Sequence, residues 1–233
     1  MRDISSTFGL SFVVVFSAVA CSPAGPRTAY ADSQRTGTVV TVRASSDAGP
    51  KSSEALRFIL APTGNTARYR VREQLVGHDL PNDAVGETKS VIGGISFDAN
   101  GKVIADASKF VLDAGSFVSD KDRRDGYVRR RLLEADQYPS IVLVPTEVRG
   151  VSLPLPTSGS RPLEITGNLT VRGVTRPTTW KGTAQFQDGR ITGTAATALT
   201  FNDIQIEQPR VPVLLSVADT IKLEIDFNFV RQP

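Results

Sequence analysis

Hydrophobic and polar residues alternate along most of the chain after residue 55. Residues 221–229 show the pattern most clearly, because five apolar side chains alternate there with four polar ones. Successive side chains of a β-strand point to opposite faces, so this segment is predicted to be a strand with one buried face. Similar patterns predict further strands at residues 56–60, 67–75, 90–97, 107–112, 141–148, 165–172, 179–186 and 190–201.

Short glycine-containing segments separate the predicted strands. Residues 98–101 (DANG) and 187–189 (QDG) are typical of hairpin turns. Residues 121–137 depart from the alternation, since their charged and apolar residues recur at helical spacing. We predict a short helix there, with Tyr127, Leu132 and Leu133 on its buried side.

These elements indicate an all-β domain, a single antiparallel barrel of about eight strands with one short helix in a crossover loop. Closure into a barrel leaves no unpaired strand edge. A barrel of this size is either filled by its own side chains or holds one small ligand. Small residues such as Gly167, Gly182, Gly193 and Ala195 share the apolar face with large ones such as Trp180, which would leave volume inside. A packed core with tapering side-chain sizes fits the same pattern, and periodicity leaves both alternatives open.

The first residues have the organisation of an export signal. Arg2 precedes an apolar run at residues 8–20 that is too short for a membrane anchor, so residues 1–20 are predicted to be a signal peptide. The run ends in Ala-Val-Ala before Cys21, which resembles a bacterial lipobox. Cys21 is therefore a candidate lipidation site that would hold the protein at a membrane surface. Cleavage after Ala31, at an A-x-A pattern, would instead release a soluble secreted protein.

The segment between the signal and the barrel is predicted to be a flexible tether. Residues 21–53 are rich in Ser, Ala, Gly, Pro and Thr, although residues 38–42 (TVVTV) have the composition of a strand. The barrel domain is then assigned to residues 54–233. We expect an exported protein of the cell envelope or periplasm, anchored through Cys21.

Composition argues against several classes of function. Cys21 and His78 are the single cysteine and histidine, so an internal disulfide, a thiolate metal cluster or a Ser-His-Asp relay is not indicated. The net charge is only +3 and the basic residues are dispersed, which argues against nucleic-acid binding. Acidic residues interleave with the basic cluster at residues 123–131, which favours a solvated, internally paired helix. We predict no cofactor, no metal and no enzymatic activity.

The most specific motif spans residues 169–177 (LTVRGVTRP) and is preceded by residues 165–167 (ITG). Gly173 permits a turn, and Pro177 is expected to end strand pairing at the strand start. Followed by Trp180 and Phe186, this segment resembles the signature strand–turn–strand of the YceI-like family. Similar family motifs occur at residues 94–98 (GISFD), 124–129 (RDGYVR), 138–141 (YPSI) and 217–221 (VADTI), and the resemblance covers roughly residues 56–231.

The resemblance implies a lipocalin-like barrel, usually exported, whose tunnel binds polyisoprenoids or other long-chain amphiphiles. Many members carry a V-x-F-x-x-H strand near the start, whereas residues 69–74 read YRVREQ here and a longer loop is expected at residues 77–87. The expected partner is an isoprenoid or fatty-chain amphiphile, and a homodimer is one option for the assembly. The alternative function is a rigid structural or interaction module without a bound lipid.

The expected ligand contacts lie on the barrel interior. They are Phe110, Leu112, Phe117, Tyr127, Ile141, Leu143, Leu169, Val171, Trp180, Ala184, Phe186, Ala195, Leu199, Phe201, Leu223, Ile225 and Phe227. Arg176 is a candidate for binding an anionic head group through charge-assisted hydrogen bonds. Its alternative is a structural role, in which it bonds loop carbonyls or pairs with Asp125.

Overall fold

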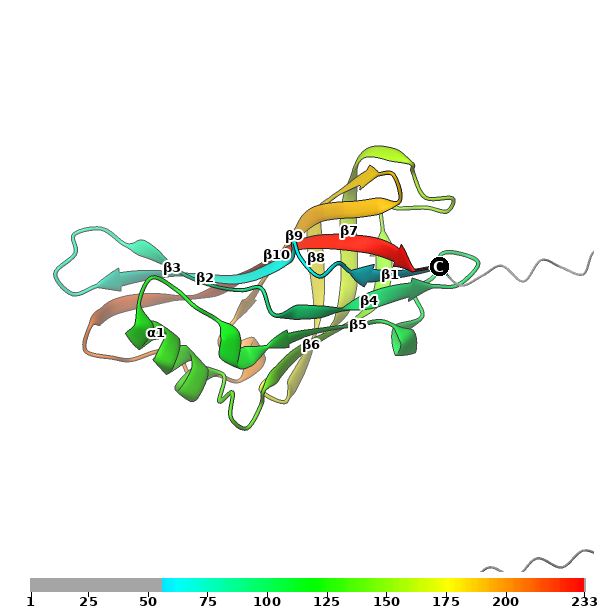
Figure 1. Cartoon of the computed structure of the whole chain (residues 1–233). Coiled ribbons are helices and arrows are strands. Elements are labelled where there is room, and N and C mark those ends of the chain that lie inside the picture. The colour runs from blue at the N-terminus through cyan, green and yellow to red at the C-terminus, as the bar shows by residue number, and fades with distance from the viewer. Residues whose placement is uncertain (1–55, 233) are drawn as a thin grey trace, which may run out of the picture. The chain divides into compact units, whose positions relative to one another are not determined.

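The computed structural model describes residues 56–232 (Figure 1). The predicted signal peptide, Cys21, the tether and the strand-like residues 38–42 lie outside the described residues. The strands are β1 (Leu56–Leu60), β2 (Thr66–Leu75), β3 (Asn82–Thr88), β4 (Val91–Phe97), β5 (Lys109–Asp113), β6 (Ser140–Arg149), β7 (Ser158–Val171), β8 (Val174–Gln187), β9 (Arg190–Thr200) and β10 (Leu214–Gln232). The helical elements are α1 (Asp122–Tyr127), a π-helical turn (Val128–Leu132) and 3₁₀ turns at Ala105–Ala107, Ala114–Ser116 and Asn202–Ile204.

Strands β1 and β10 close the sheet into a barrel. The order around the ring is β1-β4-β5-β6-β7-β8-β9-β10, and antiparallel pairing of β1 with β10 completes it. The 19 residues of β10 pair with β9 along one edge, while the other edge pairs first with β2 and then with β1. The β2–β3 hairpin therefore extends beyond the ring (Figure 1), and the prediction of an antiparallel barrel with one short helix is confirmed.

Two hairpins of the barrel turn through two residues each. Arg172 and Gly173, with φ of 48° and 76°, join β7 to β8, and Asp188 and Gly189, with φ of 47° and 78°, join β8 to β9. Positive φ at both central positions is the geometry of a type I′ turn, whose twist matches that of the flanking strands. The hairpin predicted at residues 187–189 is therefore confirmed, and the family motif forms the other one.

Pro177 does not end strand pairing in the way the sequence suggested. It lies inside β8 opposite Asn168, and the pairing of β8 with β7 continues past it to Val174. Pairing of β8 with β9 begins only at Lys181. The proline therefore occupies a position where β8 has one neighbouring strand, and its missing N–H is tolerated there.

The segment expected to be a loop at residues 77–87 contains strand β3. Its acidic residues pair across to basic residues of β2: Asp83 lies 3.3 Å from Arg70 and 3.1 Å from Arg72, and Glu87 lies 3.2 Å from Arg68. Asn, Asp, Gly and Glu are poor strand formers, so the local sequence indicates a loop. The cross-strand partners on β2, which lie outside the segment, supply what the segment itself lacks.

The predicted helix is shorter than expected, because it ends at Leu132 rather than at residue 137. Glu134, two residues beyond this end, adopts a left-handed conformation with φ of 47°, which a helix cannot contain. The backbone N–H groups of Gln137 and Tyr138 both donate to Glu134 O instead, forming a compact turn before β6.

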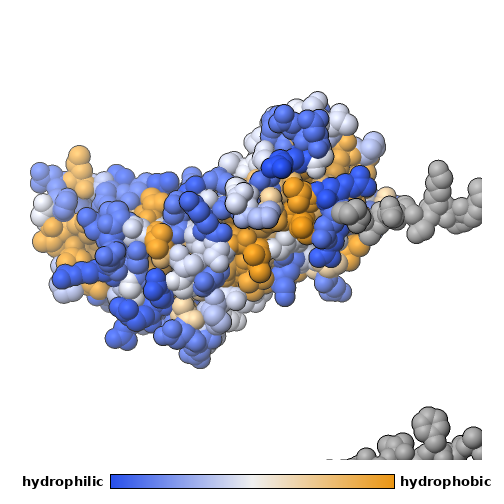
Figure 2. Space-filling view, in the orientation of Figure 1, coloured by the Kyte–Doolittle hydropathy of each residue, from blue (hydrophilic) through white to orange (hydrophobic). Residues whose placement is uncertain are grey.

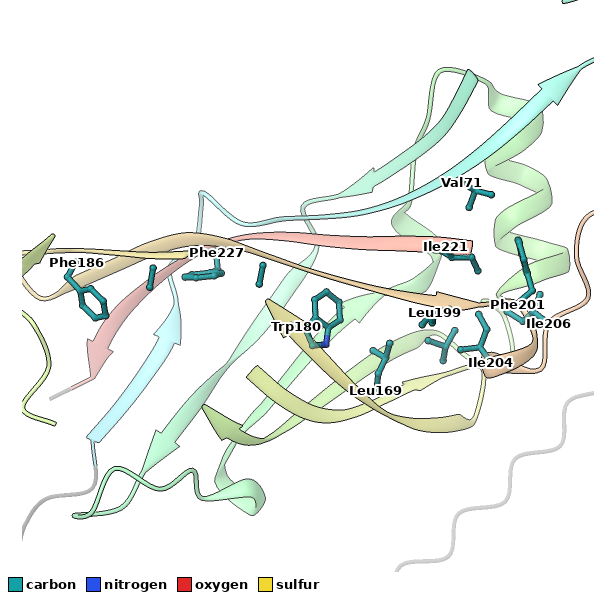
Figure 3. Close-up of a cluster of buried hydrophobic side chains, with 13 residues drawn as sticks. Val71, Leu169, Trp180, Phe186, Leu199, Phe201, Ile204, Ile206, Ile221 and Phe227 are labelled. Carbon is teal, nitrogen blue, oxygen red and sulfur yellow. The ribbon is translucent and has the colours of Figure 1, made fainter. Parts of the chain in front are cut away.

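The main hydrophobic core follows the barrel axis. Figure 3 shows its side chains in a row through the barrel, from Phe186 at one end, past Phe227 and Trp180, to Phe201 and Ile206 near the helix. On the surface, exposed apolar residues gather at the tip of the β2–β3 hairpin and around the neighbouring start of β10 (Figure 2). They are Val76, Leu80, Val213 and Leu215.

Candidate ligand-binding cavity

The barrel interior contains a cavity of about 190 Å³ beside the π-helical turn that follows α1, which we call the helix-end cavity. Inward positions of β5 to β10 form most of its wall, and β1, β2, β4 and the helical segments complete it. The predicted contacts that line it are Phe110, Leu112, Phe117, Ile141, Leu143, Leu169, Val171, Trp180, Ala195, Leu199, Phe201, Leu223, Ile225 and Phe227. Strand alternation brings these residues together because every second side chain points inward.

The cavity is suited to hydrocarbon rather than to water. An engineered apolar cavity of about 150 Å³ stays dry and binds benzene, whereas a buried water needs two to four polar partners. The indole N–H of Trp180 donates to Thr178 Oγ1 at 3.0 Å, and Thr178 Oγ1 donates to Gly167 O at 3.2 Å. The polar end of this side chain is therefore satisfied within the protein and requires nothing from a ligand.

Two charged residues, Arg68 and Glu224, contribute to the lining without making it polar. They are opposite each other in the neighbouring strands β2 and β10. Each lies between two inward-pointing residues, so both side chains point to the outer face of the sheet. Arg68 binds Asp226 at 2.7 Å, and Glu224 binds Lys222 at 2.7 Å. The hydrogen bond from Lys222 is the main cause that lowers the pKa of Glu224.

Among residues 56–232, the buried side-chain polar atom that lacks a hydrogen-bond partner is Asn228 Oδ1. Asn228 lies between Phe227 and Phe229, so its side chain points away from the cavity. It packs instead against the β1–β2 loop, where its Nδ2 donates to Thr63 O at 3.0 Å. This orphaned oxygen is therefore not offered to a molecule inside the barrel.

A second cavity, of about 420 Å³, occupies the other end of the barrel and is here called the loop-end cavity. Loops at residues 99–101 and 151–155 border it, so polar groups such as Asn100 and Ser152 belong to its lining. The predicted contacts Ala184 and Phe186 line this cavity and not the helix-end one. Phe110 and Phe227 line both.

Two predicted positions lie outside both linings. Tyr127 is half-buried on α1 but contacts neither cavity. Arg176 is exposed, and its Nε donates to Asp203 O at 2.6 Å, which links β8 to the 3₁₀ turn at Asn202–Ile204. This contact is the loop-carbonyl bond that the sequence analysis gave as the structural alternative.

The inward glycines do not supply the empty volume expected of them. A Cβ at Gly182 would lie 1.8 Å from Thr194 O, and one at Gly193 would lie 2.1 Å from Thr183 O. These glycines allow neighbouring backbones to approach closely, which agrees with the role of glycine inside strands. Among the inward residues Gly167, Gly182, Gly193 and Ala195, which were expected to leave volume, Ala195 lines the helix-end cavity.

Several lining residues were not predicted. Ile165, Ile221 and Phe229 lie on inward faces that the alternation pattern already marked, so extending the pattern would have found them. Other residues come from β2 and the helix, where the sequence predicted a strand and a buried face but not contact with the cavity, and from the turn after β9, which has no periodic signal. They are Ala67, Tyr69, Val71, Val128, Leu132, Leu133, Ile204 and Ile206.

Polar contacts fix the segments that cover the helix end. Arg172 donates to Leu132 O at 3.3 Å and lies 3.4 Å from Glu134, so the β7–β8 turn is attached to the end of the helix. Arg124 of α1 binds Glu73 of β2 at 2.6 Å. Burial raises the pKa of Tyr69 beside this pair to about 12, an effect that Arg124 partly opposes.

Within the described part of the chain, no group of three or more His, Cys, Asp or Glu residues is arranged to hold a metal ion. None of the helices between residues 56 and 232 has the length and apolar character needed to cross a membrane.

Comparison with known proteins places the barrel in a family. The YceI-like domain matches residues 59–229. UPF0312 proteins of Pseudomonas putida are 29% identical over 156 residues, which is 63% of this chain and 73% of theirs.

Solved structures with the same fold are more distant in sequence. A polyisoprenoid-binding domain from Saccharophagus degradans, implicated in plant cell wall breakdown, superimposes with a TM-score of 0.60 at 15% identity, covering 76% of this chain and 99% of that one. Burkholderia cenocepacia BcnA gives a TM-score of 0.53 at 15% identity over 72% and 98% of the two chains. The closed antiparallel barrel, the apolar interior and the match over residues 59–229 lead to one assignment: the chain belongs to the YceI-like domain family.

Proposed function

We propose that this protein binds a polyisoprenoid or another long-chain amphiphile in the helix-end cavity and carries or sequesters it without chemical change. The observation that supports this proposal most directly is the lining of the cavity. Apolar side chains form it, and the nearby polar atoms of Trp180 and Thr178 are already paired. A hydrocarbon chain needs no hydrogen bonds and is the natural occupant of such a space.

Burial of the chain would provide the affinity. Each CH₂ transferred from water contributes about 0.8 kcal/mol, so about ten buried carbons contribute roughly 8 kcal/mol before ordering of the chain is subtracted. That amount corresponds to dissociation constants near the micromolar range. Specific polar contacts are not required for binding of this strength.

The name of one structural relative supports the ligand class. The Saccharophagus degradans domain, which has the same fold, is described as polyisoprenoid-binding. The superposition of the two structures supports the fold directly, and the ligand class is carried over to this chain by analogy. We extend the proposal to export and to attachment through Cys21, which rest on the N-terminal sequence pattern.

The head group of the amphiphile would lie outside the apolar cavity, near the basic residues at the helix end. Arg172 and Arg176 are both there, but each already has a protein partner, Glu134 or Asp203 O. A head group would have to compete for these contacts. We therefore propose that the buried chain determines binding and that Arg176 acts mainly in holding the turn after β9.

Substitution of Ala195 tests the carrier function against a filled, rigid barrel. Ala195 is buried and lines the helix-end cavity, so Ala195→Phe places a ring in space that a ligand would use. We expect a folded protein that no longer carries the lipid found by native mass spectrometry on wild-type protein purified from its own cells. Ala198→Phe is the matched control, because Ala198 is exposed on the same strand.

Two results would contradict the carrier function. One is the absence of any lipid from the wild-type protein together with failure to bind added long-chain amphiphiles. The other is destabilisation of Ala195→Phe by about 1–3 kcal/mol, the cost of overpacking a core that is already full.

A further inference from the structure

Three phenylalanine rings lie between the helix-end and loop-end cavities. Phe110, Phe227 and Phe229 line both cavities, together with Ile165. The ring centroids of Phe110 and Phe229 are 5.6 Å apart, and those of Phe227 and Phe229 are 5.3 Å apart. The three rings therefore pack side by side where the two cavities meet, and we call them the aromatic wall.

Packing holds the aromatic wall in place. The Phe227 ring lies over Gly193, where an added Cβ would be 2.6 Å from the ring. Phe227 and Phe110 are buried, and the tilted ring pairs are within the favourable range of centroid distances. Phe227 and Phe229 occupy successive inward positions of β10, so the strand that completes the barrel also supplies two of the three rings.

The two sides of the aromatic wall differ chemically. The helix-end cavity is lined by apolar side chains, whereas Asn100 and Ser152 contribute to the loop-end cavity. A hydrocarbon chain lying in the helix-end cavity would keep gaining burial until its end reached the rings. Beyond them it would need to displace packed aromatic side chains to reach a more polar space.

We propose that the aromatic wall sets the length of the hydrocarbon chain that the barrel accepts. This inference rests on the proposed function, because it specifies which part of an amphiphile the helix-end cavity holds. The chain terminus lies against Phe110, Phe227 and Phe229, and carbons beyond the length of the cavity remain at the helix end in water. Such a stop selects single chains by length rather than by head group.

A series of linear saturated fatty acids that differ by two carbons tests the length limit. Trp180 is the single tryptophan, and it pairs with Ile165 at the level of the aromatic wall, so its fluorescence reports binding. In wild type, each added CH₂ should tighten binding about fourfold until the chain reaches the wall. Longer chains should then bind no more tightly.

Variants of the wall should move this limit. In Phe229→Leu and Phe227→Leu the affinity should continue to rise for chains at least two carbons longer than the wild-type limit. Phe97→Leu is the matched control, since the half-buried Phe97 lines the loop-end cavity and not the helix-end cavity that would hold the chain. It should leave the limit unchanged. Phe229 is half-buried, so its variant provides the test if Phe227→Leu fails to fold, as judged by circular dichroism.

A second measurement locates the chain end. A bromine on the terminal carbon of the longest chain that still gains affinity should quench Trp180 more strongly than a bromine beside the carboxylate. Equal quenching, an affinity that rises without limit in wild type, or an unchanged limit in folded Phe229→Leu would overturn the aromatic-wall proposal while leaving the carrier function intact. Failure of every chain to bind wild type would instead overturn the proposed function, and the length limit with it.

Discussion

At the scale of single residues, Tyr69 brings a titratable hydroxyl to the lining of the helix-end cavity. Its ring lies over Gly86, where an added Cβ would be 2.3 Å from the ring, and packs 5.7 Å from the ring of Phe117. Burial is the main cause that raises the pKa of Tyr69 to about 12, and the nearby Glu73 and Asp125 add to it. The folded protein therefore keeps this phenol neutral at a pH where the unfolded chain ionises it.

The stability of the barrel should consequently fall in alkaline solution. The stabilisation that goes with the raised pKa of Tyr69 is fully present below pH 10. It is lost as the pH rises from 10 through about 12, because the unfolded chain releases the phenol proton in this range while the folded chain still holds it. The loss in the free energy of unfolding should approach about 3 kcal/mol, since each pKa unit corresponds to about 1.4 kcal/mol. Urea unfolding across this range should show a steeper decline in wild type than in Tyr69→Phe. Parallel curves for the two proteins would contradict the prediction.

At the scale of elements, the ion pair between Glu73 and Arg124 connects β2 to α1. The carboxylate and guanidinium are 2.6 Å apart, and their side chains are only 8% and 14% exposed. A buried charge that loses its partner is costly, whereas replacing both charges together is often tolerated. The position of the helix over the cavity therefore depends on keeping this pair complete or removing it entirely.

Removal of one partner should be more damaging than removal of both. Arg124→Met leaves the Glu73 carboxylate buried and should lower the free energy of unfolding by about 3–5 kcal/mol. The double variant Glu73→Gln/Arg124→Met should regain part of that loss. Arg123→Met, at the exposed neighbouring residue, is the control and should change stability by less than about 0.5 kcal/mol. Chemical denaturation measures all three, and a double variant less stable than Arg124→Met would contradict the argument.

The sequence predicts the elements that have their own periodic signal and misses those that depend on side chains of another strand. Residues 221–229 identify a strand because apolar and polar positions alternate, and the structure places them in β10. Strand β3 lacks that signal, since Asp83 and Glu87 favour it only once the arginines of β2 lie opposite. For the same reason the lining on β5 to β10 could be predicted, whereas Ile204, which reaches the cavity from a 3₁₀ turn, could not.

At the scale of the whole molecule, the strands differ in how many neighbours support them. β8 lies between β7 and β9, whereas β3 is the last strand of the sheet and pairs with β2. Within the described residues, the outer edge of β3 makes one further backbone contact, an isolated β-bridge between Glu87 and Val118. Backbone hydrogen bonds with few buried neighbours open more often than those inside a sheet.

Hydrogen exchange should reproduce this gradient. Amides of β3 should exchange at least about tenfold faster than those of β8 in native buffer, because local opening of an edge strand needs less free energy than opening of the ring. Mass spectrometry of peptides that cover the two strands measures the difference. Equal protection of both strands would show that the hairpin is as firmly held as the barrel.

The pairing of β1 with the end of β10 also determines how the chain can fold. Arg57 pairs with Gln232, so closure joins residues from opposite ends of the domain. Contacts so distant in sequence form slowly, because the entropy of a long loop must be lost before the contact is gained. Until that step the edges of β1 and β10 and the apolar interior remain open to other chains. Closure of this seam should therefore be the slow step of folding and the stage at which the protein is most prone to aggregate.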